Sequence, residues 1–305
     1  MNRIILIGNG FDIAHGMKTS YKDFINDFWK NKGVEIIQNQ DAHECEFLKV
    51  NEKVQMNPSD LSTFSDFVDL IKKPKPEAVV KNNFFWELCQ KQSLENWVDI
   101  ENEYYQRLKQ ISKSNNLFTK RIERLRKLNE DFYQVKKILS KYILRVEDDF
   151  NEENILKIRS EISAKIHSNF KYRDLSHTSL KSISKKIYDN IKSDLKALAN
   201  DTCIENELTD TSREIRSDLK KSNFKVSDIF NLISKKYKKY DEDRIDGIYS
   251  DNILLLNFNY TDTHQEYSND NKKLRHFKNI EQIKIHGCVH EPKKNPMIFG
   301  FGDEL

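Results

Sequence analysis

The sequence is poor in glycine, proline and cysteine, and each shortage excludes a class of protein. Eight glycines and five prolines among 305 residues lie far below average usage, which argues against a turn-rich all-β fold. The four cysteines contain no Cys-x-x-Cys pair, so they predict neither a zinc site nor a disulfide framework. We therefore expect a helix-rich protein that binds no metal and resides in a reducing compartment, the cytoplasm.

Long apolar runs and a strong excess of one charge are also missing. No run approaches the roughly 20 apolar residues that cross a bilayer, and a strand begins too near the N-terminus to leave room for a signal peptide. The 51 basic and 48 acidic residues leave a net charge of +3, which does not predict nucleic-acid binding. We expect neither a membrane nor a nucleic acid as partner. The basic stretch 120–126 keeps a nucleic-acid-directed effector open as an alternative.

An apolar strand at residues 4–7 runs into a turn that contains two glycines. We predict that this strand is buried. Gly8 and Gly10 lack a Cβ atom, so the backbone there can take positive φ angles and lie close to a ligand. Thr19 or Ser20 then caps a helix that runs through Phe28, so strand, turn and helix N-terminus together predict a phosphate site. The alternative is a turn without a ligand, because Ile13 replaces the third glycine of the dinucleotide-binding fingerprint.

The middle of the chain is helical in pattern. Its clearest feature is a stripe of apolar residues spaced alternately three and four apart: Leu125, Leu128, Phe132, Val135, Leu139, Tyr142 and Val146. This spacing predicts a long helix packed into an intramolecular core, with a dimerising coiled coil as the alternative. Helices are also predicted over residues 182–198 and 227–240, and a loop over residues 39–59. We interpret residues 31–249 as a large all-helical insertion.

The sequence pattern changes after Gly247, where three short apolar segments predict strands at residues 253–256, 280–285 and 297–299. We predict one α/β domain, residues 1–30 and 250–305, with a Rossmann-like parallel sheet built from both ends of the chain. A polar motif follows each strand, and ligands bind at the carboxyl edge of such sheets. The residues that we expect to contact the ligand are Gly8, Asn9, Gly10, Phe11, Asp12, Asn257, Tyr260, Asp262, Gly287, Gly300 and Asp303.

Two side chains in these motifs are candidates for catalysis. Asn259 has an amide that can orient a water molecule or hold a sugar hydroxyl. His286 is a natural general base with an unperturbed pKa near 6.5, and Gly287 beside it predicts room for a substrate. The alternative for His286 is a core histidine bonded to a carbonyl group. A zinc site of His286, Cys288 and His290 is disfavoured, because this one-residue spacing is atypical of zinc ligands.

The motifs resemble the AbiH family of phage abortive-infection proteins. The segments that carry the resemblance are residues 7–12, 15–21 with Phe24, 96–101, 257–263 and 285–287. The family is in turn distantly similar to sirtuin-like domains that cleave NAD. The resemblance implies a sirtuin-like fold and a role in phage defence. It also implies hydrolysis of NAD to nicotinamide and ADP-ribose, with NAD as substrate and no cofactor required.

The resemblance also implies a role for individual residues. Gly8 and Gly10 would approach the phosphates of NAD, Asn259 would hold the nicotinamide ribose or the attacking water, and His286 would act as base at the ribose. Asp99 or Glu101 would stabilise the developing positive charge, the alternative being a surface pair on a helix. The zinc-binding cysteine pairs of protein-deacylating sirtuins are absent from the sequence, which argues against a deacylase. A nucleotide sensor that signals to a partner without turnover, and a homo-oligomer, remain open.

Overall fold

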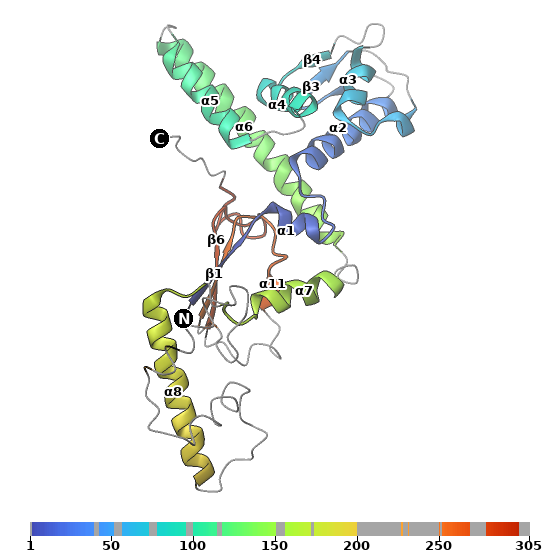
Figure 1. The fold of residues 1–305 in the computed structure, drawn as a ribbon. Helices are drawn as coiled ribbons and strands as arrows, with labels where there is room; N and C mark the ends of the chain where they lie inside the picture. The colour runs from blue at the N-terminus through green and yellow to red at the C-terminus, as the bar shows by residue number, and fades with distance from the viewer. Residues whose placement is uncertain are drawn as a thin grey trace. The chain divides into compact units, whose positions relative to one another are not determined.

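A computed structural model describes most of the chain (Figure 1). The described residues are 2–39, 43–51, 57–72, 78–95, 100–114, 118–150, 156–171, 174–199, 252–268 and 279–298, with single residues 227, 231 and 250. The chain divides into two compact units. The first unit comprises Met1–Ile5, Arg159–Leu255 and Tyr267–Glu281, and the second comprises Leu6–Ile158, Leu256–Glu266 and Gln282–Leu305. The division at residues 30 and 250 stays a prediction.

Strands from both ends of the chain form a three-stranded parallel sheet. It contains β1 (Asn2–Ile7), β5 (Asn252–Asn257) and β6 (Asn279–Lys284) in the order β1-β5-β6. The Phe258 N–H donates to the Ile7 carbonyl over 2.8 Å, and the Ile285 N–H donates to the Asn257 carbonyl over 2.8 Å. The carboxyl ends of the three strands therefore meet at one edge, as the sequence predicts.

Two details of the predicted sheet are wrong. The strand β1 is not buried on both faces, because Ile4 is 63% exposed and Leu6 is 68% exposed while Ile7 is buried. Residues 297–298 form no strand; instead the Ile298 N–H donates to the His286 carbonyl over 2.8 Å. The Cys288 N–H also donates to the Asn295 carbonyl over 2.9 Å, and these two bonds tie the segment to the end of β6 without a continuous ladder. Phe299, Gly300 and Asp303 lie outside the described residues.

The turn after β1 also differs from the prediction. Helix α1 (Asn9–Ala14) begins at once, with Gly8 as its extended N-cap residue at φ −118°. Gly10 lies within that helix. Neither glycine has a positive φ angle; among the described residues Gly16 and Gly287 do. Helix α2 (Tyr21–Gln38) follows, and the Ser20 side chain accepts the Asp23 N–H, as predicted for a cap. The helix continues past the predicted end at Phe28.

A second sheet lies in the region predicted to be all-helical, which corrects that prediction. Strands β2 (His43–Glu44), β3 (Leu48–Val50) and β4 (Ala78–Val80) pair antiparallel in that order. A single-turn 3₁₀ helix, η1 (Pro58–Asp60), follows β3. Part of this sheet occupies the predicted loop over residues 39–59. Strands of two or three residues are too short to show a period of two in the sequence.

Helices and aromatic rings build the core of the second unit. Helices α3 (Phe64–Lys72), α4 (Asn83–Glu95), α5 (Ile100–Lys113) and α6 (Phe118–Asp148) pack with α2, and α5 and α6 form an antiparallel hairpin (Figure 1). Trp29 is fully buried and stacks on Phe85 at 5.7 Å between ring centroids. The predicted stripe of α6 faces this core from Leu128 onward, with Val135 and Leu139 buried in it. The intramolecular interpretation is confirmed for this part of the stripe, whereas Leu125 lies outside the core and lines a surface groove.

The first unit contains the remaining described helices. They are α8 (His177–Ala199) and most of α7 (Leu156–Ile166), while α11 (Gln265–Ser268) crosses the unit boundary. Helix α8 confirms the prediction over residues 182–198, whereas the predicted helix over 227–240 lies almost entirely outside the described residues. Among the helices that the structure describes, none has the length and apolar character to cross a bilayer.

Candidate functional site

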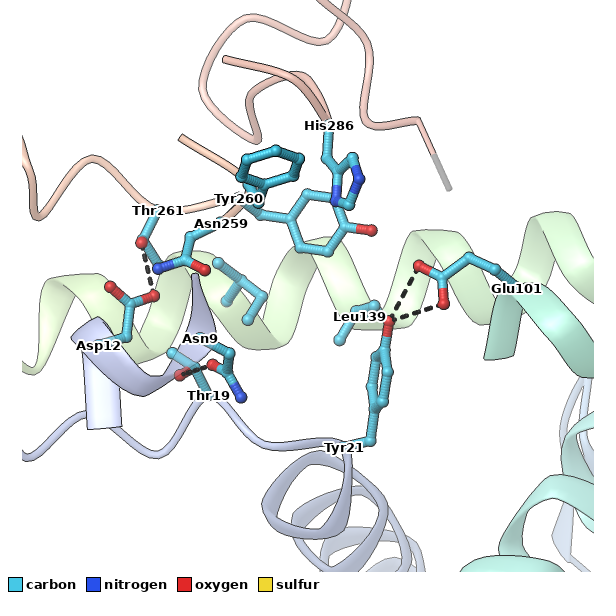
Figure 2. Close-up of a pocket in the computed structure, with 12 residues that line it drawn as sticks. Asn9, Asp12, Thr19, Tyr21, Glu101, Leu139, Asn259, Tyr260, Thr261 and His286 are labelled. Atoms are coloured by element: carbon cyan, nitrogen blue, oxygen red, sulfur yellow. Dashed lines mark hydrogen bonds between the residues drawn. The ribbon is translucent and has the colours of Figure 1, made fainter. Parts of the chain in front are cut away.

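A pocket of about 270 Å³ lies in the second unit, where the ends of β1 and β5 meet the helices (Figure 2). Its lining residues come from α1 and the segment after it, from α2, α5 and α6, and from the segments after β5 and β6. They are Asn9, Asp12, Thr19, Tyr21, Glu101, Leu139, Ile143, Phe258, Asn259, Tyr260, Thr261 and His286. The pocket therefore forms at the sheet edge that the sequence predicts. Among the residues that the structure describes, two carboxylates but no lysine or arginine line it.

Asp12 brings one carboxylate into the pocket from helix α1. Its side chain is buried, and its Oδ2 accepts a hydrogen bond of 2.7 Å from the Thr261 hydroxyl. Burial raises the pKa of Asp12 above its usual value, and the hydrogen bonds from Thr261, Thr263 and Asn259 offset only part of that increase. Its Oδ1 is buried without a hydrogen bond of ordinary geometry to a described residue.

Glu101 brings the second carboxylate from the first turn of α5. The Tyr21 hydroxyl donates to it, at 3.2 Å from Oε1 and 3.4 Å from Oε2 (Figure 2). Burial, followed by the charge of Glu101, raises the pKa of Tyr260 and keeps its hydroxyl protonated. Tyr21 and Tyr260 thus place two hydroxyl groups near one carboxylate. Asp99, the other predicted acidic candidate, lies outside the described residues.

Polar side chains from two segments line the pocket between the carboxylates and the sheet. The Thr19 hydroxyl donates to Asn9 Oδ1 over 2.6 Å. Asn259 is buried, and its Nδ2 donates to the Gly8 carbonyl over 3.0 Å. This bond fixes the amide between the ends of β1 and β5 and leaves its oxygen as the acceptor for a water or a hydroxyl.

His286 follows β6 and lines the pocket from the side opposite Asp12 (Figure 2). Its ring contacts Phe258 edge-on at 5.7 Å and Tyr260 at 6.0 Å between centroids. Burial lowers the pKa of His286 below its usual value, so the imidazole is neutral at pH 7 and can accept a proton. Its ring is half-buried and forms a hydrogen bond with the backbone of Phe258, so the alternative of a histidine bonded to a carbonyl group stays open.

Gly287 has a structural reason to be glycine. Its φ angle is 81°, and a Cβ atom at this position would lie 2.1 Å from the Pro296 carbonyl oxygen. Gly287 does not line the pocket. The space that it leaves is filled by the backbone of residues 295–296, not by a cavity beside the imidazole.

Several predicted ligand contacts hold the loop after β5 instead of lining the pocket. The Asn257 side chain is buried; its Oδ1 accepts the Asn259 N–H over 2.9 Å, and its Nδ2 donates to the Thr261 carbonyl over 3.0 Å. Asp262 forms an ion pair with Lys284. Gly8, Gly10 and Phe11 also lie outside the lining. None of these observations tests whether a bound ligand extends to them.

The three candidate zinc ligands lie in different surroundings. His286 lines the pocket, whereas Cys288 is buried with its Sγ 2.9 Å from Lys284 Nζ, and His290 Nε2 lies 2.8 Å from a carboxylate oxygen of Glu147. The described part of the chain contains no group of three or more His, Cys, Asp or Glu residues that could hold a metal.

Some lining residues were not identified as site residues from the sequence. Thr19 and Tyr21 flank the Ser20 cap, and Phe258 and Thr261 lie on either side of the predicted pair Asn259 and Tyr260. Leu139 and Ile143 lie one turn apart on α6. Proximity to a predicted motif is the only sequence signal that points to the first four. For Leu139, the apolar stripe indicates core packing and gives no sign that the core ends at a pocket.

A protein-family comparison identifies the chain. A family model described as "Bacteriophage abortive infection AbiH" matches residues 4–304. The chain therefore belongs to the AbiH family, as the motifs predict. No curated protein and no solved structure matches the chain. The Rossmann-like and sirtuin-like assignments stay predictions, and the fold itself is mixed α/β.

Proposed function

We propose that this member of the AbiH family binds NAD and hydrolyses its nicotinamide–ribose bond during abortive infection. The observation that carries the proposal is the composition of one pocket: Asp12, Glu101 and His286 line it together with the rings of Tyr260 and Phe258, and no lysine or arginine among the described residues does. The nicotinamide ring of oxidised NAD is flat and positively charged. Carboxylates and aromatic faces favour such a ring.

In this proposal the charge of the pocket also orients the substrate. A pocket lined by Asp12 and Glu101 repels the pyrophosphate, so the phosphates lie outside it while the nicotinamide and its ribose enter. The turn at Gly8 and Gly10 is the candidate position for the phosphates. A Cβ atom at either glycine would meet no heavy atom within 4 Å, and neither has a positive φ angle, so packing and backbone conformation do not explain the glycines. Close approach of a ligand does.

The proposed reaction breaks the bond between ribose C1′ and the ring nitrogen. The bonding electron pair leaves with nicotinamide, which becomes neutral, and the ribose becomes an oxocarbenium ion. Asp12 or Glu101 stabilises this cation electrostatically. A water held by the Asn259 oxygen attacks C1′, and neutral His286 accepts the proton of that water. The products are nicotinamide, ADP-ribose and one proton.

The test is nicotinamide release by the purified full chain, compared between two matched variants of helix α5. Glu101→Gln removes a carboxylate from the pocket, and we expect at least a tenfold loss of turnover, because an electrostatic group of this kind contributes about 10²–10³ in rate. Glu103→Gln makes the same change two residues away, where the side chain pairs with Lys91 outside the pocket. We expect near wild-type turnover from Glu103→Gln. Equal loss in both variants contradicts a role for Glu101.

A second candidate function is a nucleotide sensor without turnover. It is favoured because two helices, α5 and α6, supply part of the pocket wall. Glu101 belongs to α5, and Leu139 and Ile143 belong to α6. A ligand in the pocket would therefore contact the helical hairpin as well as the strand ends. Calorimetric titration separates the two functions: heat with NAD but no nicotinamide release supports the sensor. Absence of heat with NAD, ADP-ribose and adenine nucleotides refutes both.

A further inference from the structure

Helix α6 carries a second apolar stripe that does not face the core. We define this outer stripe as Phe118, Ile122, Leu125, Asn129 and Tyr133, which recur at intervals of three and four residues. Phe118 is 68% exposed, Tyr133 is 67% exposed, and Ile122 is also exposed. On the same helix Leu128 and Val135 are buried in the core. The helix therefore presents apolar side chains on two faces, and in the described part of the chain only one of them is covered.

The outer stripe borders a shallow groove on the surface of the helix. The residues that line this groove are Ile122, Leu125, Arg126, Asn129, Glu130 and Tyr133, and its volume is about 510 Å³. Arg126 and Glu130 are exposed and lie one turn apart along the same flank of the stripe. An apolar strip with one positive and one negative side chain on its flank is the pattern of a helix that packs against another helix.

We propose that the outer stripe binds the same stripe of a second copy of this chain, with the two α6 helices antiparallel. A twofold axis at the level of residue 128 brings Arg126 of each chain beside Glu130 of the other. It also places Ile122 beside Tyr133 of the second copy. The groove is thus complementary to itself in charge and in apolar character, which favours this occupant over an unrelated helix.

The parallel arrangement fits the same residues poorly. Arg121 lies on the other flank of the stripe, where its guanidinium stacks on Phe118 at 6.0 Å from the ring centroid. In a parallel pair, residues five apart on opposite flanks face each other, which brings Arg121 towards Arg126 of the second copy and sets like charges together. Asn129 is the polar residue within the outer stripe, and its Oδ1 accepts from the Tyr104 hydroxyl over 2.5 Å. A polar residue within an apolar stripe fixes the register of a helix pair.

The test measures the dimerisation constant of the full chain by sedimentation velocity between about 1 and 100 μM, the range of weak helix-mediated association. We expect a concentration-dependent dimer. Arg126→Glu and Glu130→Arg each place two like-charged pairs across the twofold axis, and each should weaken the dimer at least tenfold. The double variant Arg126→Glu/Glu130→Arg restores both pairs, and its affinity should return to within about threefold of wild type.

The matched control is Arg124→Glu, which makes the same charge change on the same helix but next to the groove beside Asn83 and Arg107. We expect Arg124→Glu to dimerise like wild type, with circular dichroism confirming that all variants retain their helices. A wild-type chain that stays monomeric at 100 μM overturns the proposal. So does a double variant that fails to recover, because it would show that residues 126 and 130 do not face each other.

Discussion

Replacement of Gly10 by alanine should raise stability and lower NAD affinity at the same time. Gly10 is the second residue of α1, and a Cβ atom there would meet no heavy atom within 4 Å. Alanine is favoured over glycine in a helix interior by about 1 kcal/mol, and less in a first turn. We therefore expect the free energy of unfolding to rise by about 0.5 kcal/mol, which shifts the melting temperature by about 1–2 °C.

The expected effect on binding has the opposite sign. If a phosphate of NAD approaches the backbone at Gly10, a methyl group displaces it, and we expect at least a tenfold loss of affinity by calorimetric titration. Gly10→Val should remove binding altogether while leaving a folded protein. The matched control is Gly16→Ala, which places alanine at a φ angle of 79° and should cost about 1–2 kcal/mol of stability without changing NAD binding. A folded Gly10→Val protein with wild-type NAD affinity refutes the reasoning.

Three further predictions concern side chains of the site. His286→Ala should abolish nicotinamide release with little loss of stability. In the wild type, turnover should fall as the pH drops through the pKa of His286, which lies below its usual 6.5; turnover that does not fall anywhere in the acid range in which the chain stays folded would exclude it as the base. Asn259→Ala should mainly reduce turnover. Asn257→Ala should mainly reduce the free energy of unfolding, by about 1–3 kcal/mol, because both the oxygen and the nitrogen of the Asn257 amide are hydrogen-bonded in the loop. Thermal unfolding and turnover of both variants check this prediction. Asp12→Asn should weaken NAD binding but not destabilise the protein at pH 7. The raised pKa of Asp12 means that its ionised form disfavours folding above that pKa, and the amide removes this cost; a large drop in melting temperature would contradict it.

The sheet and its ligand edge were predictable because they depend on short-range patterns. The apolar runs at residues 4–7 and 253–256 are both strands, and each is followed directly by polar residues. Parallel pairing then brings Asn259 and His286 to one edge. The exposure of Ile4 and Leu6 was not predictable, since a run of apolar residues gives no information about whether one or both faces of its strand are covered.

The helical side of the pocket could not be predicted, for a different physical reason. Glu101 and Tyr21 are 80 residues apart in sequence and meet because α2 and α5 both pack against α6 and its neighbours. No periodicity in the sequence encodes that contact. The start of α1 directly after Gly8 was not predictable either, because a six-residue segment is too short to show a helical period.

Two residues of helix α1, Asp12 and Gly10, are not explained by the stability of the fold. Asp12 is a charged group in a buried position, and burial raises its pKa, so this residue opposes folding when it is ionised. A stable fold alone would favour an apolar or neutral residue there. Gly10 breaks a local rule in the same turn, because a glycine occupies a helical position where alanine would fit. Gly10 and Asp12 thus disfavour stability two residues apart on α1, and Asp12 lines the pocket; such a combination is typical of a binding site in which ligand contacts, not folding, determine the residue types.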